Sequence, residues 1–242
     1  MNIRSLRSLT LAVLVAATTV AHASITSYSD FCSGQSILYT SNSGYFDLNS
    51  FNATNPFSWS DTGSQYENGY SLFGYGSYSS TLAASSTSLD LVGRVYDYLE
   101  ADNYFTYSGG YSYGSIYKQG GFNFTLDNAG VVNLSQTTYG ANQSGGGYTT
   151  CYSFLYLDGT YYTYTPGTVS FTVNVSAGSH VAFFYSGVSA SNTGYAYNSQ
   201  FSYNNANYEL RVDSQPVPEP TSMAVLALGA IGVIRRRHNR SA

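Results

Sequence analysis

Residues 167–187 read GTVSFTVNVSAGSHVAFFYSG, and the alternation in this stretch decides the fold class. Its first half places an apolar residue at every second position: Val169, Phe171, Val173 and Val175. A period of two is typical of a strand with one buried face. The segment SAGS then turns the chain, and a second strand continues through Val181, Phe183 and Tyr185. The stretch therefore predicts two adjacent strands joined by a short turn.

Three other stretches have the same pattern. Residues 122–135 (FNFTLDNAGVVNLS) and 207–213 (NYELRVD) alternate apolar and polar side chains, and the first of them predicts another hairpin. Residues 151–164 (CYSFLYLDGTYYTY) place Asp158 and Gly159 between two aromatic strands. This dipeptide favours a tight hairpin turn, in which both central residues have positive φ. Short strands joined by Gly, Asn and Asp turns predict an all-β sandwich or jelly roll for residues 24–215.

Charge is scarce and unevenly distributed along the chain. Charged residues make up 9% of the sequence, far below the roughly 25% of ordinary soluble domains. Residues 24–215 contain three basic and twelve acidic residues, so this segment has a net charge of −9. Such a surface repels phosphate backbones, and we therefore expect no nucleic-acid partner.

The N-terminal stretch MNIRSLRSLTLAVLVAATTVAHAS predicts a secretory signal peptide. Arg4 and Arg7 precede an apolar run at residues 9–20, and Ala21 and Ala23 provide the small residues of a cleavage site. We expect cleavage after Ala23. The alternatives are an uncleaved signal anchor or a short core helix, but the run is shorter than the roughly 20 residues that span a bilayer.

The C-terminal stretch VPEPTSMAVLALGAIGVIRRRHNRSA has three parts in a fixed order. A mostly apolar run at residues 223–234 predicts a short transmembrane helix, and the arginines after it favour a cytoplasmic C-terminus. The residues before and after the run are Val217, Pro218, Glu219, Pro220, and then Arg235, Arg236 and Arg237. Together the three parts resemble the PEP-CTERM sorting signal of Gram-negative bacteria.

This resemblance implies a sorting route and a domain layout. In that family an exosortase, which is a membrane cysteine protease or transpeptidase, recognises the tail, and the host bacteria often make exopolysaccharide. The implied layout is a signal peptide (1–23), an extracytoplasmic body (24–215) and a sorting signal (216–242). Residues 217–220 would be the processing motif and residues 235–237 the membrane stop. We expect a precursor anchored in the inner membrane, and then a protein at the cell surface or outside the cell.

The body also resembles the bacterial pre-peptidase C-terminal β-sandwich. The resemblance lies in the ordered segments FNFTL, AGVVNL, FLYLDG, FTVNVSAG and YELRV. That family consists mostly of non-catalytic accessory modules, so it implies a β-sandwich without a catalytic set.

Cys32 and Cys151 are the two cysteines of the chain. Because an exported chain meets an oxidising compartment, we predict a disulfide that ties the N-terminal segment to the sandwich. The alternatives are two buried thiols or pairing between molecules.

Few residues favour catalysis or metal binding. His180 is the one histidine of residues 24–215, and the sequence contains no phosphate loop. Its one G-x-S-x-G match, at residues 110–114, lies in the low-complexity segment SGGYSYGS. We therefore expect a structural or solvated His180, no cofactor and no enzymatic activity. Asp97, Glu100 and Asp102 form the densest acidic group. We expect a solvated loop there and no metal site, with Ca²⁺ binding or glycoside hydrolysis as the alternatives.

Aromatic residues leave two interpretations open. The chain has 26 tyrosines, and together with Trp59 they could stack on sugar rings or fill a sandwich core. We predict an exported surface or matrix protein with a structural or adhesive role in an exopolysaccharide-associated layer, such as a biofilm. The alternatives are a secreted carbohydrate-binding module that stacks glycans on Trp59 and, more remotely, an extracellular hydrolase.

Overall fold

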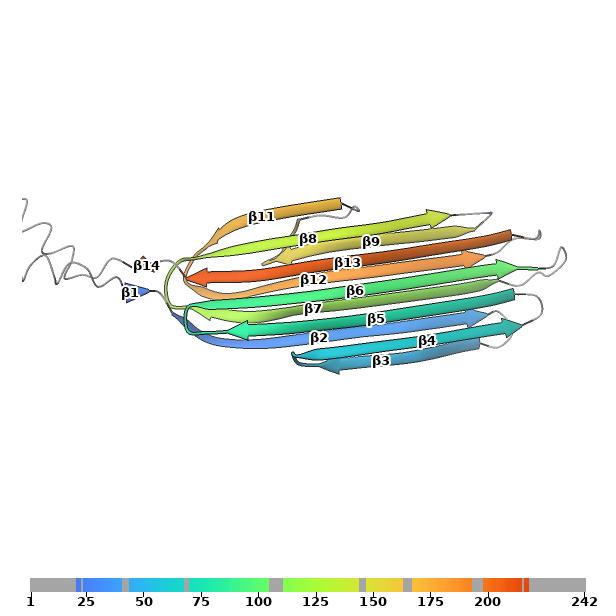
Figure 1. The fold of residues 1–242 in the computed structure, drawn as a ribbon, viewed down its shortest axis with the longest axis horizontal. Helices are drawn as coiled ribbons and strands as arrows, with labels where there is room; N and C mark the ends of the chain where they lie inside the picture. Colours follow the sequence, from blue (N-terminus) through green and yellow to red (C-terminus); the bar gives the residue numbers. More distant parts are fainter. Residues whose placement is uncertain are drawn as a thin grey trace, which may run out of the picture.

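The computed structural model describes residues 21–22, 24–40, 44–67, 70–104, 111–143, 147–162, 167–192, 198–214 and 216–217. These residues form long strands joined by turns and bends, arranged as two six-stranded sheets (Figure 1). The predicted β-sandwich is thereby confirmed. No helix within these ranges is long and apolar enough to cross a membrane. The predicted signal peptide and C-terminal helix lie outside the described residues, apart from residues 21–22 and 216–217.

Sheet 1 has the strand order β10-β9-β12-β7-β2-β3, and every neighbouring pair is antiparallel. Its strands are β2 (Ile25–Thr40), β3 (Gly44–Ala53), β7 (Ser112–Leu126), β9 (Tyr148–Leu157), β10 (Thr160–Tyr161) and β12 (Gly178–Asn192).

Sheet 2 has the strand order β11-β8-β13-β6-β5-β4, and it is also antiparallel throughout. Its strands are β4 (Phe57–Glu67), β5 (Tyr70–Ala84), β6 (Ser88–Asn103), β8 (Gly130–Gln143), β11 (Gly167–Val175) and β13 (Asn198–Ser214). A separate two-residue pair joins β1 (Ala21–His22) to β14 (Pro216–Val217).

The turn at Asp158 and Gly159 is the predicted hairpin. It joins the paired strands β9 and β10, and the φ angles of the two residues are 46° and 89°. The other two predicted hairpins are wrong. The turns at residues 127–129 and 176–177 carry the chain from one sheet to the other, since β7 and β12 lie in sheet 1 and β8 and β11 in sheet 2. Alternation could not distinguish these cases, because hairpins and sheet-to-sheet connections both direct apolar side chains to one core.

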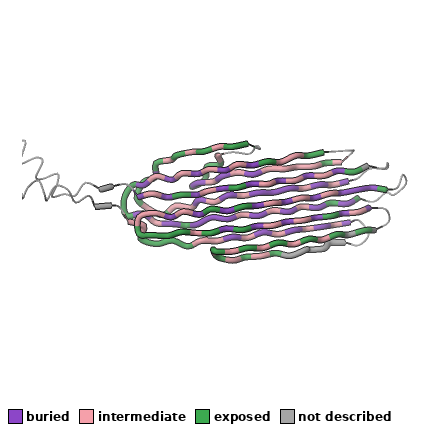
Figure 2. The backbone as a smooth tube through the Cα atoms, viewed as in Figure 1, coloured by how far each residue is buried: buried purple, intermediate pink, exposed green. Residues whose placement is uncertain are grey.

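Buried residues alternate with intermediate or exposed ones along the strands, as Figure 2 shows. The inward-facing residues form a large apolar cluster, which includes Val95, Phe122 and Phe184, and a smaller one, which includes Leu99 and Val188. Between the two clusters, strands β6, β7, β8, β9, β12 and β13 contribute polar side chains to the interior. These buried residues include Asp97, Lys118, Gln136, Thr138, Ser153, Ser186, Ser202 and Asn204. The core is therefore two apolar clusters with a polar layer between them.

Both ends of the body lie at the same end of the sandwich. Ile25 of β2 pairs with Leu126, and Ser214 of β13 pairs with Gly130, so the first and last long strands flank the same turn. The β1–β14 pair lies at this end, with the sandwich extending away from it (Figure 1). A 15-residue strand such as β5 is about 50 Å long at roughly 3.3 Å per residue. The body therefore projects about 50 Å from the end where the tail begins.

Candidate functional site

The outer side of sheet 1 carries a cluster of aromatic rings, which we call the aromatic face. Alternation in β9 and β12 turns every second residue outward, and these positions are aromatic in the middle of both strands. The aromatic face consists of Phe31, Tyr117, Tyr152, Phe154, Tyr156, Tyr161, Phe183 and Tyr185. Phe183 and Tyr185 thus lie outside the sandwich, while Ala182 and Phe184 fill the core.

Tyr185 lies at the centre of this face. Its ring is stacked with Tyr117 at 5.9 Å, Tyr152 at 5.8 Å and Phe154 at 5.0 Å between centroids, with interplanar angles of 7°, 14° and 5°. In a second stacked pair, the ring centroids of Tyr156 and Phe183 are 4.3 Å apart. Burial among these rings raises the pKa of the Tyr185 hydroxyl far above its ordinary value, so it stays neutral. The parallel rings form an ordered, uncharged array across neighbouring strands.

Polar groups beside the rings are amides and hydroxyls. The Tyr117 hydroxyl donates to Gln35 Oε1 at 2.7 Å, and Gln119 Nε2 donates to Ser33 Oγ at 2.9 Å. No charged side chain lies at the outward positions of β7, β9 and β12 or at residues 31–39 of β2. The outer side of sheet 2 differs, because it carries Arg94, Glu100, Glu209 and the Arg211–Asp213 ion pair.

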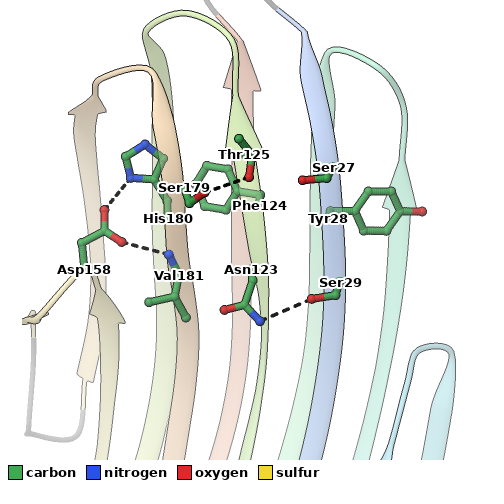
Figure 3. Close-up of a pocket in the computed structure, with 10 residues that line it drawn as sticks. All are labelled: Ser27, Tyr28, Ser29, Asn123, Phe124, Thr125, Asp158, Ser179, His180 and Val181. Carbon is green, nitrogen blue, oxygen red and sulfur yellow. Dashed lines mark hydrogen bonds and ion pairs between the residues drawn. The ribbon is translucent and has the colours of Figure 1, made fainter.

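A pocket of about 500 Å³ lies on sheet 1 toward the end where the tail begins (Figure 3). Hydroxyl and amide side chains line much of it: Ser27, Ser29, Asn123, Thr125 and Ser179. Two pairs of these residues are in contact across neighbouring strands. Asn123 Nδ2 donates to Ser29 Oγ at 3.4 Å, and the Thr125 and Ser179 hydroxyls are 3.1 Å apart. Ser29 lies two residues before Phe31 on β2, and Val181 lies two residues before Phe183 on β12. Residues two apart in a strand point to the same side, so the pocket continues the aromatic face.

His180 lies at the edge of this pocket and is held by two acceptors. Its Nδ1 is 2.6 Å from Asp158 Oδ2, and its Nε2 is 3.0 Å from the Ser176 carbonyl oxygen (Figure 3 shows the first contact). A general base needs a nitrogen directed at the proton that it removes. Here both nitrogens are engaged, and Asp158 also accepts from the Val181 amide at 2.9 Å. This arrangement fastens the β9–β10 turn to β12.

The acidic group is divided between different surroundings. Asp97 is fully buried between the sheets, where it pairs with Lys118. Glu100 accepts from the Tyr98 hydroxyl at 2.9 Å, and Asp102 accepts from the Tyr104 hydroxyl at 3.0 Å. The expectation of a solvated loop is wrong, since all three carboxylates belong to β6. In the described part of the chain no three His, Cys, Asp or Glu residues are grouped as a metal site.

Trp59 packs among other rings near the edge of the sandwich. Its centroid is 5.0 Å from that of Phe51, and Lys118 Nζ is 5.1 Å from its centroid. The ring is half-buried and contacts interior groups. The sequence pointed to Trp59 as the stacking residue, whereas the aromatic face on the outer side of sheet 1 does not include it.

The predicted disulfide between Cys32 and Cys151 is wrong, because both cysteines are free thiols. In the register of sheet 1, Cys32 of β2 lies opposite Leu155 of β9, with β7 and β12 between the two strands. Three strand spacings amount to about 14 Å, and Cys151 lies four residues further along β9, another ~13 Å. Bridged cysteines require Cα atoms about 4.4–6.8 Å apart. Sequence spacing could not reveal this separation, since it depends on the order of strands in the sheet.

The residues predicted to direct processing lie near the two ends of the chain. Of the predicted processing residues, Ala21 and Val217 pair in β1–β14, whereas Ala23, Pro218, Glu219, Pro220 and residues 235–237 lie outside the described residues.

A search of curated proteins finds no match for this chain. Residues 216–237 match the PEP-CTERM protein-sorting motif, which implies export through a membrane-anchored precursor to the cell surface. The chain therefore carries the PEP-CTERM sorting signal of an exported protein that is targeted to an exosortase.

Proposed function

We propose that the exported body is a structural and adhesive component of an exopolysaccharide-associated layer, and that it adheres through the aromatic face. The observation that carries this proposal is the ordered array of outward rings around Tyr185. Sites for organic ligands combine aromatic surfaces with a few polar groups. The C–H faces of sugar rings can stack on such a surface, and sugar hydroxyls can bond with neighbouring amides such as Gln35 and Gln119.

Charge favours a neutral polysaccharide as the occupant. The aromatic face presents no charged side chain at its described outward positions, and residues 24–215 have a net charge of −9. An acidic polymer would be repelled by this body, whereas a neutral chain incurs no such penalty. The pocket lined by Ser27, Ser29 and Asn123 extends the same surface with hydroxyl and amide groups, and the Asp158 carboxylate in its lining is paired with His180.

A secreted carbohydrate-binding module is the second candidate, and the same rings favour it. The two functions differ in what binding achieves. A matrix protein retained at the surface joins cells to polymer, whereas a released module only binds polymer.

The first experiment measures retention of the mature protein, isolated from its native host, on insoluble neutral and acidic polysaccharides. We expect retention on a neutral polymer and a loss of at least ten-fold in affinity for the Phe154→Ser, Tyr185→Ser double variant. The matched control is Phe201→Ser, Tyr203→Ser, which removes two stacked rings from the outer side of sheet 2. Equal losses in both variants, or no retention on any neutral polymer, would contradict the proposal.

The second experiment separates the two candidates in the native host. If the protein is adhesive, the double variant of the aromatic face should reach the cell surface in normal amounts while cell aggregates lose cohesion. Undiminished cohesion with reduced polymer retention would instead favour the released carbohydrate-binding module.

A further inference from the structure

The most unusual pair of side chains lies in the polar layer, away from the aromatic face. Lys118 projects from β7 of sheet 1 and Asp97 from β6 of sheet 2, and both side chains are 0% exposed. Lys118 Nζ is in direct contact with Asp97 Oδ1. The pair thus spans the space between the two sheets, with apolar clusters on either side along the strands.

Two further side chains complete this group. Ser186 is the cross-strand neighbour of Lys118 in sheet 1, and Asn204 is that of Asp97 in sheet 2. Ser186 Oγ donates to Asp97 Oδ2 at 3.1 Å, and Asn204 Nδ2 donates to Ser186 Oγ at 2.9 Å. Asp97 therefore has one oxygen against the amine and the other held by a hydroxyl.

The lysine side chain is confined as well as buried. Added Cβ atoms at Gly34 and Gly76 would meet Lys118 Cγ at 2.9 Å and Nζ at 2.6 Å, respectively. The Trp59 ring lies 5.1 Å from Nζ. With no room on these sides, the amine cannot move far from the carboxyl group.

Burial also determines the protonation of the pair. Desolvation lowers the pKa of Lys118 well below its ordinary value. Separated charges are costly in a low-dielectric interior, and the lowered pKa of Lys118 favours a neutral amine at this position. A desolvated lysine with a free lone pair is a nucleophile.

We propose that Lys118 and Asp97 condense into an intramolecular amide that joins the two sheets covalently. The Nζ lone pair attacks the Asp97 carboxyl carbon, and the C–Oδ1 bond breaks. The hydroxyl on Oδ1 leaves with a proton from Nζ, so one amine and one carboxylic acid yield one amide and one water. The reaction is neither an oxidation nor a reduction, and it requires no co-reactant.

Ser186 is the positioning residue of this reaction. Its hydroxyl donates to Oδ2, the oxygen on which negative charge develops as the amine attacks. A donor aimed at such an oxygen stabilises the transition state. Asn204 in turn fixes the Ser186 hydroxyl through its own amide.

The test is the mass of the mature protein from its native host, measured after denaturation and reduction, with both chain ends identified by peptide mapping. We expect a mass lower by one water than the sequence requires, and a branched peptide that contains Lys118 and Asp97. A mass equal to that of the unmodified chain would overturn the proposal without any variant. A mass lower by one ammonia, together with a branched peptide that contains Lys118 and Asn204, would overturn the assignment of Asp97.

Four variants sharpen the result. Lys118→Met and Lys118→Arg should both have the unmodified mass, and circular dichroism shows which of them folds. Ser186→Ala should slow the loss of water at least ten-fold in freshly made protein, and Ser186→Thr should restore it. An unchanged rate in Ser186→Ala would contradict the role of this hydroxyl.

Discussion

Two buried tyrosine hydroxyls make the fold sensitive to alkali. Tyr78 Oη and Tyr208 Oη are 2.6 Å apart within the large apolar cluster. Burial raises the pKa of Tyr78 from 10.0 to about 12, and it raises that of Tyr208 well above its ordinary value. The unfolded chain therefore loses these protons at a lower pH than the folded protein does.

The resulting prediction concerns stability at high pH. The contribution of Tyr78 is complete below pH 10.0 and is lost as the pH rises to about 12. For each proton that the folded protein keeps and the unfolded chain has lost, the free energy of unfolding falls by about 1.4 kcal/mol per pH unit. Urea denaturation between these pH values should show a falling free energy of unfolding, with a shallower fall in Tyr78→Phe. The control Tyr139→Phe removes an exposed hydroxyl, and an equal change in both variants would contradict the assignment.

The two cysteines are expected to react slowly. Burial raises the pKa of both Cys32 and Cys151 to about 11, so little thiolate is present at neutral pH. A thiol reagent should find two free thiols per chain after denaturation, and label them at least ten-fold more slowly in the folded protein. A count of zero in the denatured, non-reduced protein would restore the disulfide.

Glycines within the strands are required where two sheets meet closely. Gly120 of β7 faces inward, and a Cβ at this position would overlap with Tyr78 Oη. Gly159 of the β9–β10 turn has a φ of 89° and open space around it. Alanine substitutions at Gly120 and Gly159 therefore test steric overlap and backbone strain separately.

We expect the two alanine substitutions to differ in cost. Gly159→Ala should lower the free energy of unfolding by about 1 kcal/mol, because it introduces backbone strain alone. Gly120→Ala should cost about 3 kcal/mol, since ordered aromatic side chains must move. Urea denaturation measures both, and a tolerated Gly120→Ala would show that the tyrosine pair is not closely packed against β7.

Strand positions could be predicted from the sequence better than strand partners. The alternation of Phe122, Phe124 and Leu126 identified a buried strand side, and all three are buried. The turn at Asp158 and Gly159 was also predictable, because positive φ requires particular residues. Which strands pair was not predictable, since both kinds of connection direct apolar side chains to the same core. The polar layer was missed for a related reason: Asp97 and Lys118 come together only when the two sheets stack.

The first and last long strands of the body begin and end at the same place. Residues 25 and 214 flank the same turn, so the long axis of the body extends away from the end where the tail begins. The aromatic face runs along that axis on one side of sheet 1. A cross-link between Lys118 and Asp97 would join the sheets midway along this length. Such a body resists being pulled apart into sheets, which suits a protein that joins a surface to a polymer.

The sorting tail gives a prediction for the complete chain. Replacing Pro218, Glu219 and Pro220 with alanine should leave membrane insertion intact, because the apolar run at residues 223–234 is unchanged. Processing should stop, since all three residues belong to the matched sorting motif at residues 216–237. The uncut precursor should then accumulate in the membrane fraction of the native host.

Replacing Arg235, Arg236 and Arg237 with glutamine should have a different effect. Arginine charges resist translocation of the short apolar run that precedes them, so their loss should reduce membrane retention and release more protein uncut. Mass spectrometry of the C-terminus and membrane fractionation distinguish the two variants, and Asn239→Ala, outside the matched segment, is the control. A C-terminal helix packed on the sandwich would instead leave an intact Ala242 terminus in the wild type and in every variant, with all protein in the soluble fraction. That result would remove exosortase processing, and with it the argument that the aromatic face acts at the cell surface.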